Sequence, residues 1–292
     1  YTDYKFEEPA VTGQTFYIDP VNGSPNGDGS INNPWRTLQE VLDSNLIECY
    51  RPGESYDPES ELILVNEGAP VKGGDRLILQ SGYHGFIRQS YLMFSDWLTI
   101  EAGEGETPVF SQINFTGAFK NIYLKNLTID KSSYQGTENY WEAEDVTRNT
   151  NAGVYLGTSN FWGNCSHIKL YGLDVKTTGD VSNWAAEDWV EKAAAGIGIR
   201  SAKNIEVVNC SIRNIRHGIS VDYDSDNSII VNNSITDFCG DGSRIISNNV
   251  LFAYNTIIGC LKVDDNHDDG IQSWSRDKNG NVGKGTVTGV TL

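Results

Sequence analysis

Ionisable side chains are concentrated in one short stretch, residues 262–274, which reads KVDDNHDDGIQSW. It holds four aspartates, one histidine and one lysine, and then becomes an apolar run that ends in Trp274. Burying so many ionisable groups is costly, so the stretch is expected to line a cleft or to bind a metal ion. His267 is the side chain best suited to proton transfer near neutral pH, and we expect it to be functional.

The four aspartates of this stretch carry the hard oxygen ligands that Ca²⁺ prefers, although their spacing is not that of an EF-hand loop. Asp264 and Asp269 are the predicted calcium ligands. Lys262 stands among these acids and has two interpretations: a base whose pKa is lowered by desolvation, or a solvated charge that balances its neighbours. The second interpretation is favoured.

Composition limits the class of protein. The 292-residue chain is 38% hydrophobic, is rich in Gly, Asn, Ser and Thr, and has a net charge of −17. This mixture is typical of a β architecture with many turns. The charge argues against nucleic acid as a partner, and an acidic polymer would need cations or a local basic cluster at its binding site.

The sequence has no run long enough to span a membrane and no signal peptide. It starts at Tyr1 rather than at Met, which is compatible with removal of a targeting segment, and we expect a secreted, periplasmic or extracellular protein, with phage or cell-surface association as a variant. The five cysteines are an odd number without a CxxC pair, so most are expected to be small buried hydrophobic residues.

A repeat in the second half of the chain decides the predicted fold. Asn209, Asn232 and Asn255 are spaced by 23 residues, and each lies within a strand-like segment. A period in the twenties with a recurring turn asparagine is typical of a parallel β-solenoid, in which each amide bonds to the next coil. The strand-like segments are 121–129, 168–175, 205–212, 229–235 and 251–258.

A second column of strand-like segments starts at the glycines of 153–156, 196–199, 218–221, 242–245 and 270–273. Aligning these glycines places His217, Asp241 and Asp269 in one column, about 4.8 Å apart from coil to coil. Columns two and four residues after the glycine are expected to line a groove on the same face. Together with two insert tryptophans, the predicted substrate-binding residues are Tyr155, Arg200, Asp222, Asp241, Gln272, Trp274, Trp141 and Trp184.

We expect one domain over residues 1–292, with a start and cap in 1–60 that includes a helix in 33–42, and coils in 61–292. Inserts at 131–151 and 177–194 break the period and are aromatic-rich, so they are expected either to wall the groove or to pack on the solenoid. The last residues, 287–292, read as another strand, so a partner chain or a further segment is expected to cover the C-terminal end.

The order of strand, Asn/Gly/Pro loop, NPWRTLQEVL helix and GDRLIL strand resembles the start of the parallel β-helix proteins of the pectate-lyase-like superfamily. This resemblance implies an all-β fold, a right-handed single-stranded parallel β-helix with a short N-terminal capping helix. Members of the superfamily include uronate-polysaccharide lyases, mannuronan C5-epimerases, polygalacturonase-type hydrolases and phage tailspikes.

Residues 265–268, DNHD, are similar to the D-x-H-D pattern of the mannuronan C5-epimerases, whose Asp and His are catalytic. Asn266 stands where that pattern usually has Pro, and Lys262 stands where it has a catalytic Tyr. Residues 242–247, GSRIIS, are loosely similar to a segment of alginate and chondroitin lyases that carries a catalytic Lys, which is absent here. The predicted catalytic residues are His267, Asp268, Asp265, Lys262, Arg244 and His217.

Uronate lyases and epimerases both begin by removing the proton at C5 of the sugar, which requires neutralisation of the carboxylate, a base and an acid. Arg244 or bound Ca²⁺ is expected to neutralise, and His267 or Lys262 to act as the base. The leading hypothesis is therefore an enzyme that acts on an acidic uronate polysaccharide, alginate-like or pectate-like, as lyase or epimerase. The alternatives are a non-catalytic glycan-binding spike or adhesin, and an inverting glycoside hydrolase with two carboxylates from Asp222, Asp241, Asp268 and Asp269.

Overall fold

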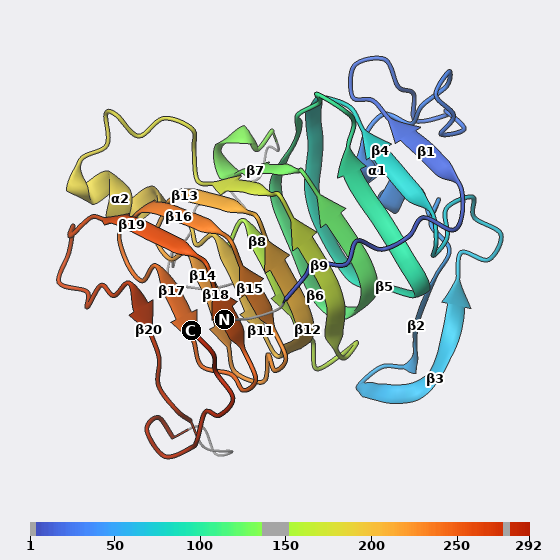
Figure 1. Cartoon of the computed structure of the whole chain (residues 1–292). Coiled ribbons are helices and arrows are strands. Elements are labelled where there is room, and N and C mark those ends of the chain that lie inside the picture. The colour runs from blue at the N-terminus through green and yellow to red at the C-terminus, as the bar shows by residue number, and fades with distance from the viewer. Residues whose placement is uncertain (1–3, 136–151, 277–280) are drawn as a thin grey trace.

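The chain winds into stacked coils of β-strand around one axis, from the N-terminal end to the C-terminal end (Figure 1). The computed structural model describes residues 4–135, 152–276 and 281–292. Helices in these ranges are short: α1 (Leu38–Asp43), α2 (Ala186–Lys192) and the 3-10 turn η1 (Lys131–Ser133). None of them is long and apolar enough to cross a membrane. The predicted all-β parallel β-helix with a short N-terminal helix is confirmed.

Three columns of parallel strands run along the axis. The first column contains β1 (Thr15–Ile18), β4 (Arg76–Leu79), the ends of β5 (Gly82–Ala102) and β6 (Pro108–Lys125), β9 (Cys165–Tyr171), β12 (Ala202–Val208), β15 (Ile229–Val231) and β18 (Leu251–Ala253). The second contains β7 (Thr128–Asp130), β10 (Asp174–Lys176), β13 (Ser211–Ile215), β16 (Ser234–Phe238) and β19 (Thr256–Cys260). The third contains β8 (Val154–Gly157), β11 (Ile197–Arg200), β14 (Ile219–Asp222), β17 (Ser243–Ile245) and β20 (Ile271–Gln272).

An antiparallel hairpin, β2 (Cys49–Glu54) and β3 (Asp57–Val65), stands beside the first coils. The expected boundary at residue 60 falls inside β3. Parallel pairing of β1 with β4 also starts the stack before residue 61. Helix α1 starts at Leu38, because the Thr37 side chain accepts the Glu40 amide hydrogen at 3.2 Å and thereby caps it.

The core is built from aliphatic side chains that repeat in register. Ile122, Ile168 and Ile205 lie opposite one another on β6, β9 and β12, and all three are fully buried. Alternate residues of each strand therefore form continuous apolar columns inside the coil, and burial of this surface is the main favourable contribution to folding.

The glycines that open the third column are required by close packing between coils. A Cβ atom on Gly218 would lie 2.0 Å from the carbonyl oxygen of Gly242 and 2.7 Å from Cγ2 of Ile235. A Cβ atom on Gly242 would lie 2.7 Å from the Gly270 carbonyl oxygen. This crowding explains the glycines that follow His217 and Asp241, whereas a Cβ atom on Gly270, which follows Asp269, would meet nothing within 4 Å.

The asparagine repeat divides into two columns, and the predicted alignment is wrong for Asn255. Asn209 and Asn232 stack as expected, with a side-chain hydrogen bond of 2.5 Å over 23 residues. Asn255 instead contacts Asn233, 22 residues away, through bonds of 2.9 Å. The step from β15 to β18 is 22 residues, one shorter than the step from β12 to β15, so Tyr254 takes the left-handed turn position, with φ of 58°.

Replacing the buried Asn233 by alanine is expected to lower the free energy of unfolding by at least about 2 kcal/mol. Its Oδ1 accepts the amide of Cys210 and its Nδ2 donates to the carbonyl of Val207, both at 2.9 Å, so two buried backbone groups would lose their partner. Urea unfolding measures this change. Asn232→Gly, at an exposed left-handed position, is the matched control, and equal losses in both variants would contradict the argument.

Beside the last coil, the segment 288–291 pairs with β18, where the Phe252 amide donates to the Thr291 carbonyl at 2.8 Å. In the described ranges, β19 has no further strand beside it, and its Ile258 is 62% exposed. Coverage of this edge by a partner or a further segment stays a prediction.

Candidate functional site

The candidate site occupies the outward face of the third strand column and the loop that precedes β20. Register places one outward residue of each strand in line, and Arg200 pairs with Asp222 at the strand ends. The buried Ser220 lies between Gly198 and Arg244 of the neighbouring coils. The residues in line on the face are Tyr155, Gly198, Ser220, Arg244 and Gln272.

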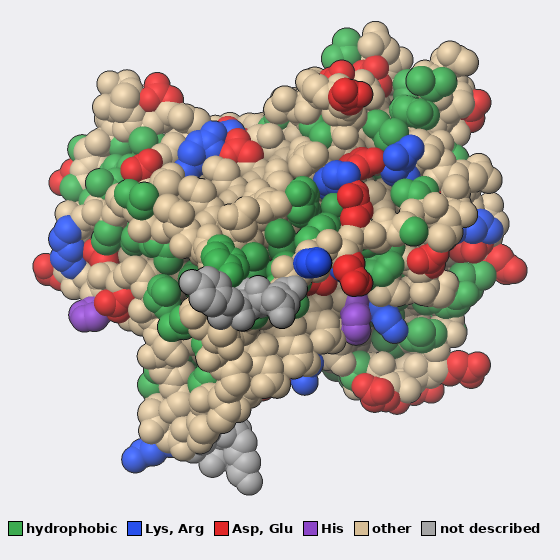
Figure 2. Space-filling view, viewed as in Figure 1, with side chains coloured by type: hydrophobic (Ala, Val, Ile, Leu, Met, Phe, Trp, Pro, Cys, Tyr) green, Lys and Arg blue, Asp and Glu red, His purple; other side chains and the backbone are tan. Residues whose placement is uncertain are grey.

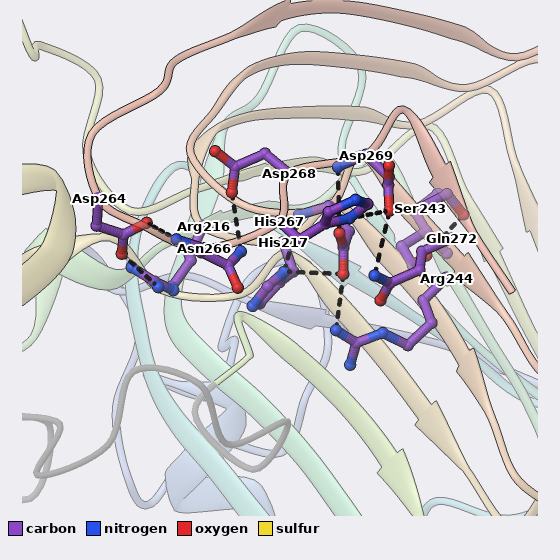
Figure 3. Close-up of polar contacts among 12 residues, drawn as sticks. Arg216, His217, Ser243, Arg244, Asp264, Asn266, His267, Asp268, Asp269 and Gln272 are labelled. Carbon is purple, nitrogen blue, oxygen red and sulfur yellow. Dashed lines mark hydrogen bonds and ion pairs between the residues drawn. The ribbon is translucent and has the colours of Figure 1, made fainter. Parts of the chain in front are cut away.

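His217, Asp241 and Asp269 lie one above another on three coils, at the corner where the strands begin; Figure 3 labels His217 and Asp269. The Asp241 amide donates to Nδ1 of His217 at 3.0 Å, and the Asp269 amide donates to Oδ1 of Asp241 at 3.3 Å. His217 therefore carries its proton on Nε2. Burial, with the nearby charges of Arg244 and Arg216, lowers the pKa of His217 to about 3. This imidazole is neutral at physiological pH and is a weak base, so its position favours a structural role.

Asp241 is the buried acid of the stack, with only 2% of the residue exposed. Its Oδ2 accepts a hydrogen bond of 2.7 Å from Nη2 of Arg244. Burial raises the pKa of the Asp241 carboxyl, and the ion pair with Arg244 opposes that increase only in part. Arg244 is thus the counter-ion that allows a carboxylate to occupy this position.

Arginine and aromatic side chains alternate over the C-terminal ends of the strands. The Arg244 guanidinium lies 5.1 Å from the centre of the Trp274 ring, and the Trp274 indole donates to the Tyr223 hydroxyl at 3.0 Å. The Tyr223 ring has the guanidinium of Arg200 at 5.6 Å and that of Arg276 at 4.4 Å. We call these five residues the arginine–aromatic cluster. It provides a local concentration of positive charge on a strongly acidic chain.

Sequence reasoning missed two residues of this cluster, Tyr223 and Arg276. Arg276 follows Gln272 and Trp274 at a spacing of two residues, the period of side chains on one face of an extended chain. That spacing could have identified it. Tyr223 lies in the acidic run 222–226, DYDSD, where no spacing marks it as a binding residue.

His267 is the exposed member of the site and pairs with Asp269 (Figure 3). Nδ1 of His267 lies 3.0 Å from Oδ2 of Asp269, which also accepts a 3.2 Å hydrogen bond from Gln272. A carboxylate can only accept, so Nδ1 holds a proton, and Nε2 is the nitrogen left to accept a proton in the neutral ring. The His267 side chain is 85% exposed. This arrangement is that of a general base oriented by an acid.

The loop that carries His267, residues 262–269, is joined to an earlier coil by an ion pair. Nη2 of the buried Arg216 donates to Oδ2 of Asp264 at 2.9 Å, and the Asn266 amide donates to Oδ1 of Asp264 at 3.0 Å. Hydrogen bonding to Arg216 lowers the pKa of the Asp264 carboxyl. In the described part of the chain, Nε and Nη1 of Arg216 have no hydrogen-bond partner. Asp264 is therefore the link between the coil and the loop.

Lys262 and Asp268 close the same loop. The Lys262 ammonium donates to the Asn266 carbonyl and lies 3.6 Å from Oδ2 of Asp268, whose side chain is almost inaccessible. Asn266 also donates to Asp268 at 2.8 Å. These contacts favour a structural role for both residues rather than the predicted catalytic one. Asp265 is exposed on the loop.

The predicted calcium ligands Asp264 and Asp269 are directed to different partners, Arg216 and His267. Across the described ranges, no group of three or more His, Cys, Asp or Glu residues is arranged to hold a metal ion. The side chains do not fit a calcium site as they stand, so calcium binding remains a prediction and no step below depends on it.

The remaining predicted binding residues are more enclosed. Trp184 packs edge-on against Trp189, with ring centres 5.0 Å apart, in an apolar cluster that also contains Val263. This position supports packing over stacking on a sugar. Tyr155 is buried in a small cluster, and burial raises the pKa of its hydroxyl. Trp141 lies outside the described residues.

Removing Asp264 is expected to cost more stability than removing Arg216. Asp264→Ala leaves a buried guanidinium without its counter-ion, at a cost of about 3–5 kcal/mol. Arg216→Met leaves a carboxylate whose side chain is 25% exposed and can be solvated, so about 1 kcal/mol is expected. Thermal unfolding measures the stabilities, and hydrogen exchange of residues 262–269 measures loop opening. Equal losses would contradict the role of Asp264 as the link.

The pair also predicts a pH dependence. The folded pKa of Asp264 is lowered, so its contribution is present above the unfolded pKa and is lost as pH falls through the folded pKa. The protection of the loop amides, which is their exchange rate compared with the intrinsic rate at the same pH, should therefore fall under acid conditions in the wild-type protein and change less with pH in Asp264→Ala.

Comparison with known proteins supports the fold. No model of a known protein family and no curated protein sequence matches the chain. Among solved structures, a GH136 lacto-N-biosidase from Eubacterium ramulus is similar with a TM-score of 0.53 and 15% identity, over 90% of this chain. The present chain spans 56% of that enzyme's length. A rhamnogalacturonan lyase (TM-score 0.48, 12% identity, 90% of this chain and 67% of that one) is also similar. At these identities the similarity concerns the parallel β-helix fold alone.

Proposed function

We propose that the protein is a carbohydrate-active enzyme that binds an acidic, uronate-containing glycan along the outward face of the third strand column and abstracts the C5 proton. The observation that supports this proposal is the arginine–aromatic cluster, which continues through Arg244, Asp241 and Asp269 to the solvent-facing His267. Cation, stacking surface and base therefore lie in one contiguous network.

The cluster suits a sugar acid. Guanidinium groups bind carboxylates in a bidentate manner, and aromatic rings pack on the apolar faces of sugars. The chain as a whole has a charge of −17 and would repel such a polymer, so a local group of arginines is the feature that allows binding.

In the proposed reaction, an arginine of the cluster neutralises the uronate carboxylate and so stabilises the negative charge that develops when the C5 proton leaves. His267 takes that proton on Nε2, and Asp269 stabilises the imidazolium. In a lyase, the electron pair of the C5–H bond forms the C4=C5 double bond, the C4–O4 bond breaks with its electron pair on O4, and O4 takes a proton from solvent water or from the His267 imidazolium. In an epimerase, a proton returns to the opposite face of C5.

An inverting glycoside hydrolase is the second candidate, because Asp241 has the raised pKa that a general acid needs and Asp222 lies on the same face. The similar fold of the GH136 lacto-N-biosidase is compatible with this alternative.

Incubation with alginate, pectate, glucuronan and glycosaminoglycans separates these reactions. New near-ultraviolet absorbance from an unsaturated uronate supports a lyase, and deuterium incorporation at C5 without absorbance supports an epimerase. Reducing ends without absorbance would contradict proton abstraction and support the hydrolase. Binding without any product would support a glycan-binding protein instead.

A further inference from the structure

A second group of aromatic rings lies on two loops beside the first strand of the site. The loop after β8, residues 158–164, carries Phe161 and Trp162, and the β2–β3 hairpin carries Tyr56. Ring centres are 4.7 Å apart between Phe161 and Trp162 and 4.8 Å apart between Phe161 and Tyr56. The Arg51 guanidinium lies 4.9 Å from the Trp162 ring centre, and the Tyr91 ring is 5.4 Å from it. We call these five residues the loop platform.

The two loops hold each other in place. The Tyr56 amide donates to the Phe161 carbonyl at 2.7 Å, and Oγ of Ser159 accepts the amides of Phe161 and Trp162 at 3.1 and 3.4 Å. Backbone bonds between Ser159 and Gly163 of 2.8 and 2.9 Å close the turn. The rings are thus presented by hydrogen-bonded turns, and little conformational entropy remains to be lost on binding.

The outer rings of the platform face solvent. Tyr56 is 71% exposed and Phe161 is 38% exposed. Exposed, contiguous aromatic surface on a structured loop is typical of a binding site, because packing alone would bury it.

The platform continues the candidate site along the axis. Gly157, which ends β8, pairs with Arg200 of the arginine–aromatic cluster, and the loop begins at the next residue. Oγ1 of Thr158 donates to the Ser201 carbonyl, which joins the two strand ends. At about 4.8 Å for each coil, the four steps from β8 to β20 place the platform about 19 Å from the coil of His267 along the axis.

Acidic side chains beside the platform determine which face of a sugar could bind there. Acidic side chains gather over the neighbouring hairpin at the lower right of Figure 2, where Asp57, Glu59 and Glu61 are exposed. They disfavour a carboxylate directly on the outer rings. A pyranose ring presented through its apolar C–H face avoids this repulsion.

We propose that the loop platform is a distal subsite that stacks a sugar ring of the same glycan whose uronate is bound near His267. This inference rests on the proposed function for the substrate's other end. It implies that the enzyme distinguishes long chains from short ones by affinity and not by chemical rate.

The test compares Phe161→Ala and Tyr56→Ala/Phe161→Ala with the wild type on oligosaccharides of increasing length from the best substrate. The expected result is a KM raised by about three- to tenfold for chains long enough to reach the platform, with unchanged kcat. Short oligosaccharides should show no change. Ile258→Ala, at an exposed apolar position on the distant β19 edge, is the control and should behave as the wild type.

An unchanged KM for long chains in an active enzyme would overturn the subsite and leave the proposed function intact. If no substrate reacts, electrophoresis through gels that contain each polysaccharide of the panel replaces the kinetics. Retardation of the wild type that is lost in the double variant supports the platform. Equal retardation of both proteins, or none in any gel, overturns it.

Discussion

His267→Ala should lower kcat of the proposed reaction by about 100- to 10,000-fold, the usual contribution of a general base. The expectation follows from its geometry: Nδ1 lies 3.0 Å from Asp269, and the side chain that carries Nε2 faces solvent. Because the side chain is 85% exposed, folding stability should be almost unchanged. Initial rates on the best substrate of the panel, with thermal unfolding in parallel, measure both effects.

Two further variants test whether the loss of activity is specific to His267. Asp269→Asn keeps the size of the side chain but removes the carboxylate that orients His267, so a smaller decrease in kcat is expected, without loss of the fold. His167→Asn is the control, because His167 lies on β9 in another strand column. Asparagine tolerates the left-handed backbone of that position, so this variant should retain full activity. Full activity in His267→Ala would refute the site assignment.

The second large effect is expected for Arg244→Ala, which should lower the free energy of unfolding by about 3–5 kcal/mol at neutral pH. The variant leaves the Asp241 carboxylate buried without the guanidinium that now lies 2.7 Å from it. It also removes a cation from the arginine–aromatic cluster, so binding of the acidic glycan should weaken. Chemical unfolding and affinity electrophoresis measure the two losses separately.

The pH dependence of this loss has a definite sign. The pKa of Asp241 is raised in the folded state by burial, so its ionised form opposes folding, and this cost vanishes once the group is protonated in both states. The deficit of Arg244→Ala should therefore shrink as pH falls from about 8 to about 4. Arg244→Ala/Asp241→Asn should recover stability but not glycan binding. A deficit independent of pH would contradict the assignment of the cost to Asp241.

Much of the fold was predictable because it depends on local patterns that recur. Alternating aliphatic residues, such as those around Ile168 and Ile205, place one face of each strand in the core, and glycines such as Gly218 mark where coils touch. The helix after Thr37 follows from a capping side chain within the same segment. These signals involve neighbours in sequence or a constant period.

Other features depend on contacts that no period encodes. The shift of Asn255 onto Asn233 arises from a coil that is one residue shorter, and helix α2 lies inside an insert that has no repeat. Arg216 and Asp264 are 48 residues apart and meet only because coil corners two turns apart superpose. The pairing of Tyr223 with Trp274 likewise crosses 51 residues.

By itself, the sequence determined a parallel β-helix, the column of His217, Asp241 and Asp269, and a loop rich in ionisable groups around His267, because strand alternation and a coil length repeat along the chain. Only the tertiary structure decided which of these groups are buried and which are exposed. His217 and Asp241 are buried within the stack. His267 is exposed on a loop that the Arg216–Asp264 ion pair fixes in position. The physical reason is that desolvation and ion pairing depend on neighbours from other coils, and these set the pKa and the exposure of each group.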